Sequence, residues 1–393
     1  MKRKIILLIV IYIIFIALGL PDALIGSGWN MIREDLHVSL GTLGFMTVAV
    51  YSMSVLATFN APRLLRLLET KRIAIISVFL TGTALIFISQ VTAFYQMLFF
   101  AIPLGIGAGA IDVSLNHYMA KNYEAKHMNY LHSFYGIGVT LGPTVMAYTL
   151  SQNSWRNGYI IVGLMLLVIA LIALLTHKLW AKEPKEERED THAHIKIKDI
   201  LKIKGAIASI LIFMFYVHIE SLGGVWIASY FYIQKDISYA SAALFTTTYY
   251  LALTIGRLTS GFVSSIVTPQ QLVKIGQTLI VISAVLMLFN FSSLWVYYVI
   301  VFLFGLGCAP IYPNMMFLNS IYFEKKQLSK MVSLQMALGY MGFGILTPLA
   351  GLFFDKISIA FFPIFVLFTG TILWLITLRL MANKKLVFKT INS

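Results

Sequence analysis

The stretch "KLWAKEPKEEREDTHAHIKIKDILKIKG", residues 178–205, is a polar segment of 28 residues in a largely apolar chain. Of the 393 residues, 59% are hydrophobic and 12% are charged, whereas a soluble domain carries about 25% charged residues. The mean hydropathy is +0.83. This composition is typical of a protein that crosses the bilayer many times. The polar segment therefore predicts a linker between two membrane-embedded halves.

Long apolar stretches lie on both sides of this linker, and a spanning helix needs about 20 mostly apolar residues. The predicted spans are residues 5–30, 40–62, 73–92, 96–120, 129–151 and 156–177 before the linker, and 206–233, 239–264, 270–291, 294–318, 330–354 and 358–382 after it. We expect an all-α membrane protein with two pseudo-symmetric bundles of six helices. The predicted domains are 1–177 and 206–393, the second ending in a short cytoplasmic tail.

The basic residues predict the orientation of the chain in the membrane. With the N-terminus inside, only Arg33, Arg156, Lys235 and Lys356 of the 30 Lys and Arg residues fall on the outside. Both termini are therefore expected in the cytoplasm, and the protein is expected in the cytoplasmic (inner) membrane. The start of the chain resembles a secretory leader, but its apolar run continues to Ile25, so we expect a retained first span.

Several classes of function lack their sequence signals. The net charge of +14 sits in short loops, without a basic stripe interleaved with aromatic residues, so we expect no nucleic-acid partner. The chain holds no phosphate-binding GxxxxGK[ST] loop and no HExxH motif. We expect no enzyme activity, no cofactor and no metal. The single cysteine, Cys308, excludes an intrachain disulfide.

The two halves repeat some of the same features. Gly105 and Gly107 in the fourth span match Gly305 and Gly307 in the tenth, at an offset of 200 residues. These glycines predict close helix packing rather than a nucleotide site, because no strand precedes them. Duplicated six-helix halves around a site at mid-membrane depth are typical of secondary transporters.

Three acidic residues fall inside predicted spans: Asp22, Asp112 and Glu220. No Lys or Arg is predicted at a comparable depth, since Arg257 is placed near the inner end of its span. Three ionised carboxyl groups in hydrocarbon would cost roughly 8–10 kcal/mol on insertion scales. We expect these groups to face a hydrated cavity, to hold a proton, or both, because burial without a cation favours the protonated carboxyl group. The alternative interpretation is that each acid caps or hydrogen-bonds neighbouring helices.

Helical spacing places other polar and aromatic residues near these acids. Asp112 and Asn116 share one face of the fourth span, and Tyr216 and Glu220 share a face of the seventh. The prolines at 310 and 313 predict a broken tenth helix. The residues predicted to bind substrate are Asp22, Asp112, Asn116, His132, Tyr135, Tyr216, Glu220, Trp226, Tyr312 and Asn314. Carboxylates, amides and aromatic faces together suit a polyhydroxylated ligand.

The chain resembles the major facilitator superfamily, and within it the fucose permease family of sugar:proton symporters. The matching segments are "GLPDALIG" at 19–26, "GAGAIDVSLN" at 107–116, "MNYLHSFYGIG" at 128–138, "FYVHIESLGGVWIASYF" at 215–231, "IYPNMM" at 311–316 and "GFGILTPLAGLFFD" at 342–355. The resemblance implies roles in proton coupling and sugar binding for the carboxylates Asp22 and Asp112. It also implies a sugar contact at Asn116.

The chain departs from that family at several positions. His132 and Tyr135 stand where the family has amides, and Glu220 stands where it has a neutral polar residue. The superfamily signature after the second span is reduced to "NAPRLLRLLETKR", residues 60–72, although its basic residues remain. The resemblance therefore implies an inner gate at Arg63, Arg66 and, after the eighth span, Arg257.

We therefore expect a monomeric transporter that couples protons to a small polar solute, most simply a sugar. Asp22, Asp112 and Glu220 are its predicted proton-coupling residues. The first alternative is an antiporter that exports lipophilic cations or lipids, because Glu220 lies among Phe, Tyr and Met residues. The second is a membrane-embedded enzyme or sensor, which would require a pair of catalytic groups or a soluble domain.

Overall fold

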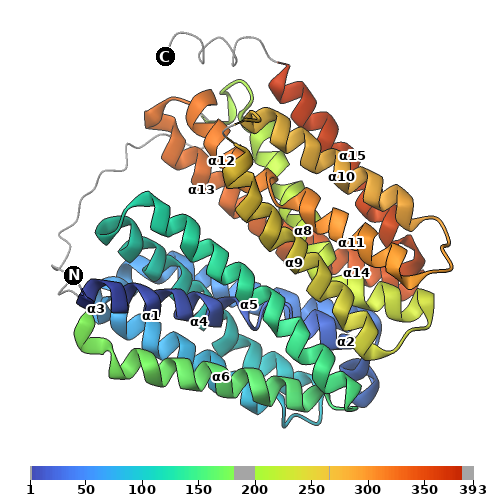
Figure 1. Ribbon diagram of the computed structural model, residues 1–393, viewed down its shortest axis with the longest axis horizontal. Helices are drawn as coiled ribbons and strands as arrows, with labels where there is room; N and C mark the ends of the chain where they lie inside the picture. The colour runs from blue at the N-terminus through green and yellow to red at the C-terminus, as the bar shows by residue number, and fades with distance from the viewer. Residues whose placement is uncertain (1, 181–199, 265, 383–393) are drawn as a thin grey trace. The chain divides into compact units, whose positions relative to one another are not determined.

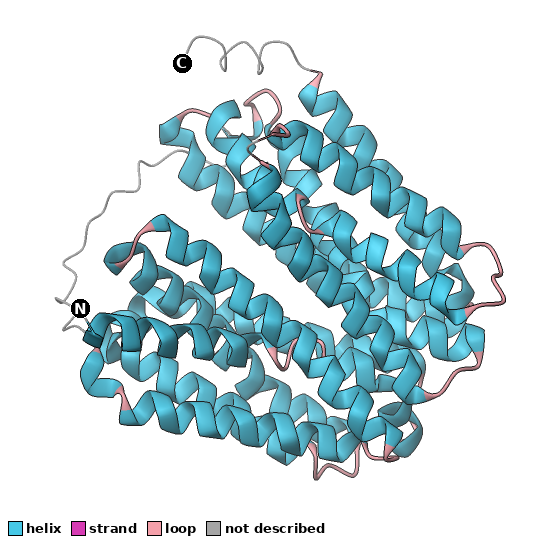
Figure 2. Cartoon of the chain, in the orientation of Figure 1, coloured by secondary structure: helices cyan, strands magenta, loops and turns pink. Residues whose placement is uncertain are grey.

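The computed structural model describes residues 2–180, 200–264 and 266–382, and every regular element in these ranges is a helix (Figures 1 and 2). The long helices are α1 (Lys2–Gly19), α2 (Leu24–Asp35), α3 (Leu43–Ile88), α4 (Phe94–Asn122), α5 (Ala125–Ser151), α6 (Trp155–Leu175), α8 (Ala206–Lys235), α9 (Tyr239–Val263), α10 (Pro269–Met287), α11 (Leu294–Cys308), α12 (Ile311–Tyr322), α13 (Lys325–Met341), α14 (Thr347–Lys356) and α15 (Phe362–Met381). Short helical turns are η1 (Leu40–Thr42), η2 (His177–Leu179), η3 (Gly342–Leu346) and η4 (Ile359–Phe361).

These helices supply the twelve predicted spans, so the all-α membrane fold is confirmed. The first span is α1 with α2, and the tenth is α11 with α12, which confirms the predicted break in that helix. The second and third spans are the two parts of α3, which are joined at Glu69, a residue with non-helical backbone angles. Within the described ranges, ten spans are long and apolar enough to cross a membrane by hydropathy alone. The remaining two are the more polar α5 and α9.

The described chain divides into two compact units. Unit 1 contains residues 2–180, the segment Val225–Thr247 and the segment Gly351–Ile357. Unit 2 contains residues 200–224, Thr248–Ala350 and 358–382. Most of the linker lies outside the described residues. The division at 1–177 and 206–393 stays a prediction.

Glycines set the close packing within each unit. A side chain at Gly105 would strike the backbone of Val50, and one at Gly107 would strike Thr81, so α4 packs tightly against both parts of α3. In unit 2, Gly305 lies against the backbone of Tyr249 in α9, and Gly307 lies against Gly276 in α10. The glycines repeated in the sequence therefore make equivalent contacts, as small residues do between membrane helices.

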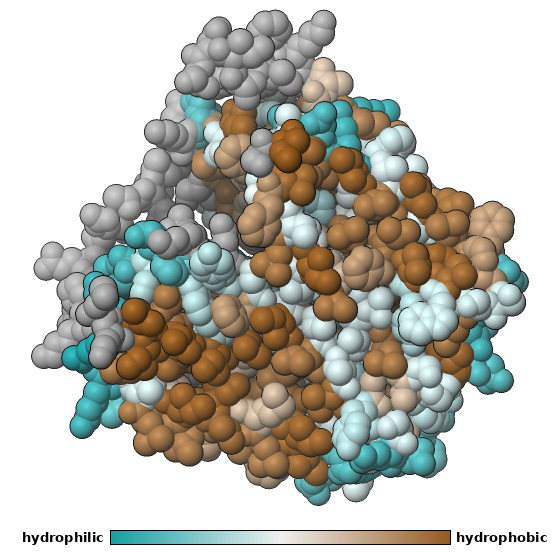
Figure 3. All heavy atoms as spheres, viewed as in Figure 1, coloured by the Kyte–Doolittle hydropathy of each residue, from teal (hydrophilic) through white to brown (hydrophobic). Residues whose placement is uncertain are grey.

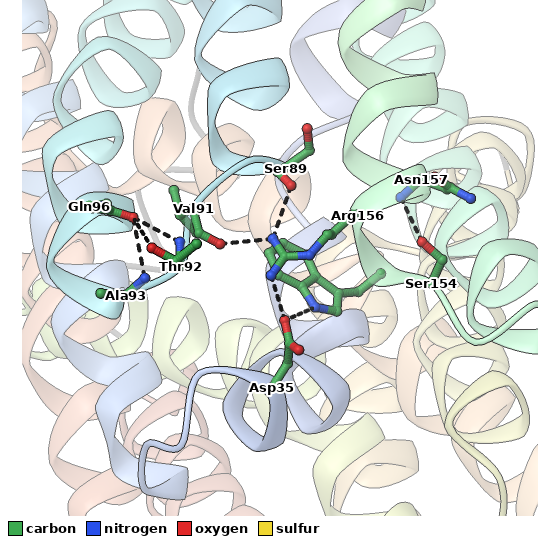
Figure 4. A network of polar contacts seen from close by, with 10 residues as sticks. Asp35, Ser89, Val91, Thr92, Ala93, Gln96, Ser154, Arg156 and Asn157 are labelled. Atoms are coloured by element: carbon green, nitrogen blue, oxygen red, sulfur yellow. Dashed lines mark hydrogen bonds and ion pairs between the residues drawn. The ribbon is translucent and has the colours of Figure 1, made fainter.

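One end of unit 1 is held together by the side chain of Arg156 (Figure 4). Its Nη2 donates to Oδ2 of Asp35 at 2.7 Å, and its Nη1 donates to the carbonyl oxygens of Ser89 and Val91 at 3.0 and 2.8 Å. The guanidinium also lies 4.4 Å from the ring centre of Trp155. One residue at the start of α6 thus joins the end of α2 to the turn after α3.

The surface of the molecule is apolar where helices face outward. Apolar residues dominate the face in Figure 3, and polar residues gather toward its margins. Large apolar side chains such as Phe59, Tyr95, Leu175 and Phe368 are exposed. A water-soluble protein rarely exposes so much contiguous apolar surface, whereas a bilayer solvates it.

Candidate functional site

Asp22 lies at a break in the first span, between the end of α1 at Gly19 and the start of α2 at Leu24. Proline at position 21 has no N–H to continue the helix, which places the break at this point. The Asp22 side chain is exposed, and its Oδ2 accepts a hydrogen bond from the hydroxyl of Tyr135 in α5 at 2.5 Å. A carboxyl group at the interrupted part of a membrane helix is thus held by a neutral donor.

Asp112 occupies the middle of α4 and is half-buried. The Nδ2 atom of Asn116, one turn further along, donates to Oδ1 of Asp112 at 2.9 Å and also to its backbone oxygen. Asp22 and Asp112 are close enough to interact electrostatically. In the described part of the chain, neither carboxyl group forms an ion pair.

Glu220 in α8 has a basic partner, contrary to the prediction. Nη2 of Arg257 in α9 lies 3.1 Å from Oε1 and 3.3 Å from Oε2 of Glu220. Each side chain is about a quarter exposed, at 24% for Arg257 and 25% for Glu220. The expectation that no Lys or Arg lies at the depth of the three acids is therefore wrong for Glu220. Arg257 reaches inward from α9 instead of staying at the membrane surface.

Two tyrosines complete this ion pair. The Tyr216 hydroxyl donates to Oε2 of Glu220 and accepts from Arg257 at 3.3 Å. The Tyr249 hydroxyl lies 3.1 Å from the backbone oxygen of Glu220 and 3.5 Å from the sulfur of Cys308. Tyr249 was not predicted from the sequence. The adjacent glycines of "SLGGVW" were a possible signal, because a Cβ at Gly223 would overlap the Tyr249 ring.

An aromatic cluster lies beside Tyr216, and the space that it encloses has no room for a water molecule. The Tyr312 ring lies 6.3 Å from that of Tyr216 and 5.6 Å from that of Phe213, centre to centre. The residues of the cluster, all in unit 2, are Ile212, Phe213, Tyr216, Ile311, Tyr312 and Met315. Tyr312 lies in the first turn of α12, just after the break between α11 and α12, so the break places an aromatic side chain in this cluster.

The chain matches a model of the Major Facilitator Superfamily over residues 9–231 and 219–389. It belongs to this superfamily. The chain is therefore a multi-pass membrane protein from a superfamily of transporters, which confirms the resemblance seen in the sequence.

Among curated relatives, the chain is 22% identical over 389 residues to Bypass of stop codon protein 6 of Saccharomyces cerevisiae, covering 90% of this chain and 78% of that protein. It is 23% identical over 352 residues to the glucose/mannose transporter GlcP of Bacillus subtilis, covering 86% and 84%.

Solved structures of superfamily members share the fold. The nucleoside transporter NupG matches with a TM-score of 0.79 at 12% identity, over 96% of this chain and 99% of that chain. A D-xylose-proton symporter matches with a TM-score of 0.76 at 15% identity, over 96% and 97%. FucP in the outward conformation matches with a TM-score of 0.62 at 15% identity, over 96% and 99%.

The remaining predicted residues separate into packed and exposed groups. The indole of Trp226 is fully buried against Gly351 and Phe354, so we leave Trp226 out of the proposed site. The buried amide of Asn314 donates to the Pro310 carbonyl oxygen at 2.7 Å and to the Ser260 hydroxyl at 3.3 Å. The exposed residues are His132, Arg63 and Arg66. His132 packs edge-on against Phe15, and the gating role of the two arginines stays a prediction.

Proposed function

We propose that this superfamily member is a proton-coupled transporter of a small neutral polyhydroxylated solute, with a monosaccharide as the best fit, acting by alternating access. The observation that carries the proposal is the pair of carboxyl groups Asp22 and Asp112. Both lie within membrane spans, interact electrostatically, and accept hydrogen bonds from a phenol and an amide. Such intramembrane acids are typical of proton relays in transporters.

Protonation changes what these two groups offer to a ligand. An ionised carboxylate only accepts hydrogen bonds, whereas a protonated one also donates. A solute rich in hydroxyl groups can satisfy either form, since each hydroxyl both donates and accepts. An anionic solute would be repelled by the carboxylates of unit 1.

The relatives support this solute class. GlcP is a glucose/mannose transporter, and one structural neighbour is a D-xylose-proton symporter. The exporter alternative relied on Glu220 as an unpaired acid that could accept a lipophilic cation. The ion pair with Arg257 neutralises that charge, so the structure no longer favours the alternative.

The proposal is tested by Asp112→Asn in proteoliposomes, with D-glucose, D-mannose and D-xylose as radiolabelled probes. One proton moving down 100 mV releases about 2.3 kcal/mol, enough for roughly 50-fold accumulation of a neutral solute. We expect the wild type to accumulate at least one probe when a proton gradient is imposed. The variant should only equilibrate that probe, while exchange of labelled for unlabelled solute continues.

Asp236→Asn is the matched control. It removes a carboxylate from an exposed position with a φ of 48°, which asparagine also adopts readily. The control should accumulate solute like the wild type. Wild-type accumulation by Asp112→Asn would remove Asp112 from the coupling mechanism. If none of the three sugars is transported together with protons by the wild-type protein, the sugar:proton assignment is rejected.

A further inference from the structure

A second buried polar cluster lies in unit 2, away from the ion pair. Nδ1 of His218 in α8 lies 2.9 Å from the hydroxyl oxygen of Thr347, the first residue of α14. The Ser221 hydroxyl is hydrogen-bonded to the Thr347 hydroxyl and donates to the His218 carbonyl oxygen at 2.8 Å. His218 stands two residues before Glu220 and therefore about 200° around the helix from it. The proposed transport site uses none of these three side chains.

The cluster closes around an irregular turn. Residues Gly342–Leu346 form the π-helical turn η3, in which the Thr347 N–H donates to the Gly342 oxygen five residues earlier. The Thr347 hydroxyl also donates to that oxygen at 3.3 Å, and the His218 ring is hydrogen-bonded to the Gly342 backbone. A Cβ at Gly342 would overlap the carbonyl oxygen of Met214, so α8 and η3 meet in backbone contact. Wide turns of this kind are rare inside α-helices and are common at functional sites.

Both helices continue beyond the cluster, α8 to Lys235 and α14 to Lys356. The two helices stay packed there, because the Trp226 and Phe354 rings meet edge to face with centres 5.8 Å apart.

We propose that His218, Ser221 and Thr347 form a clamp that positions a hinge at η3. The clamp fixes the wide turn to α8, so that α14 leaves η3 in a set direction alongside α8. Without it, the extra residue of η3 can be lost to a regular helix, which turns the following segment by about 100°. His218 is a positioning residue in this scheme and makes no contact with the solute.

Hydrogen–deuterium exchange on the full chain in lipid nanodiscs tests the clamp. His218→Leu and Thr347→Val each remove the hydrogen bonds, and we expect amide exchange across 342–350 to rise about tenfold in each. The double variant should show no larger rise in exchange than the stronger single variant, because each change breaks the same hydrogen-bonded cluster. His218→Gln keeps a polar donor and acceptor and should restore exchange close to the wild-type rate.

Gln277→Leu is the matched control. It removes an equally buried hydrogen bond, from Nε2 of Gln277 to the Thr377 hydroxyl at 2.7 Å, between α10 and α15. It should leave the amide exchange rates of residues 342–350 unchanged. Wild-type exchange at 342–350 in both His218→Leu and Thr347→Val would overturn the proposal. So would an equal rise in Gln277→Leu or a uniform rise along α15, since either shows general destabilisation. No solute enters this measurement, so its outcome is independent of the transport assay.

Discussion

Glu220 and Arg257 differ physically from the two aspartates of unit 1, because each carries its own counter-charge. Removing an ion from water costs several kcal/mol, and a close partner with further hydrogen bonds recovers that cost. Tyr216 supplies such a bond to Glu220. The pair therefore holds two opposite charges together, whereas Asp22 and Asp112 accept hydrogen bonds from neutral donors. Under the proposed function, this contrast favours Asp22 and Asp112 as the groups that exchange protons.

Breaking this ion pair should destabilise the protein more than removing it whole. Glu220→Gln leaves Arg257 half-buried without its carboxylate partner, and Arg257→Gln does the same to Glu220. Loss of one partner of a fully buried pair costs about 3 kcal/mol or more, and the cost here should be smaller because each side chain is about a quarter exposed. We expect a lower thermal midpoint in detergent for each single variant and a partial recovery in the double variant. Additive losses would show that the two charges are not coupled.

The sequence predicted which acids lie inside the membrane but not what each one contacts. Spacing along one helix placed Tyr216 and Glu220 on a shared face, and the structure joins them by a hydrogen bond. The Arg257 contact depends on how α8 and α9 pack and on the reach of a long side chain, and neither is visible in the spacing of α9. Asn314 shows the converse, because its predicted role as a ligand took no account of the Pro310 carbonyl oxygen and the Ser260 hydroxyl, to which its amide donates.

Whole helices were more predictable than their irregularities. Hydropathy located the spans because each must bury some 20 residues in hydrocarbon, and the prolines of the tenth span located its break. The break at 20–23 and the wide turn η3 were not predicted. Each lies beside a close approach to another helix, of Gly19 to Gly138 and of Gly342 to Met214. Such contacts between distant segments decide where a helix departs from regular geometry.

Glycine packing between helices leads to a stability prediction with an internal control. Gly105→Ala places a methyl group against the Val50 backbone, which cannot move aside, and overpacking of this kind costs typically 1–3 kcal/mol. In Gly261→Ala in α9, the added methyl group meets no atom within 4 Å. The better helix propensity of alanine should therefore leave the stability of the protein equal or slightly higher. Thermal unfolding in detergent measures both. Equal midpoints for the two variants would contradict close packing at Gly105.

The two units share a packing plan across the whole molecule. In unit 1, Gly138 of α5 lies against the Ile16 carbonyl of α1, and in unit 2, Gly342 lies against the Met214 carbonyl of α8. The first and fifth spans thus correspond to the seventh and eleventh. The polar contacts between these spans differ, because unit 1 joins Asp22 to Tyr135 and unit 2 joins His218 to Thr347 at positions that do not correspond. The same packing plan therefore carries different polar contacts in the two units.

The orientation of the whole chain follows from the same basic residues that predict cytoplasmic termini. In the predicted topology, all but four of the Lys and Arg residues lie on the side of the N-terminus, and positively charged loops tend to stay in the cytoplasm. Single cysteines placed at two exposed loop positions, in a Cys308→Ser background, test this in intact cells with a membrane-impermeant maleimide. Ser238→Cys, after α8, should react at once. Lys121→Cys, near the end of α4, should react only after the membrane is permeabilised. The reverse labelling pattern would show the opposite topology, and the proposed proton uptake by Asp112 would then start from the other side of the membrane.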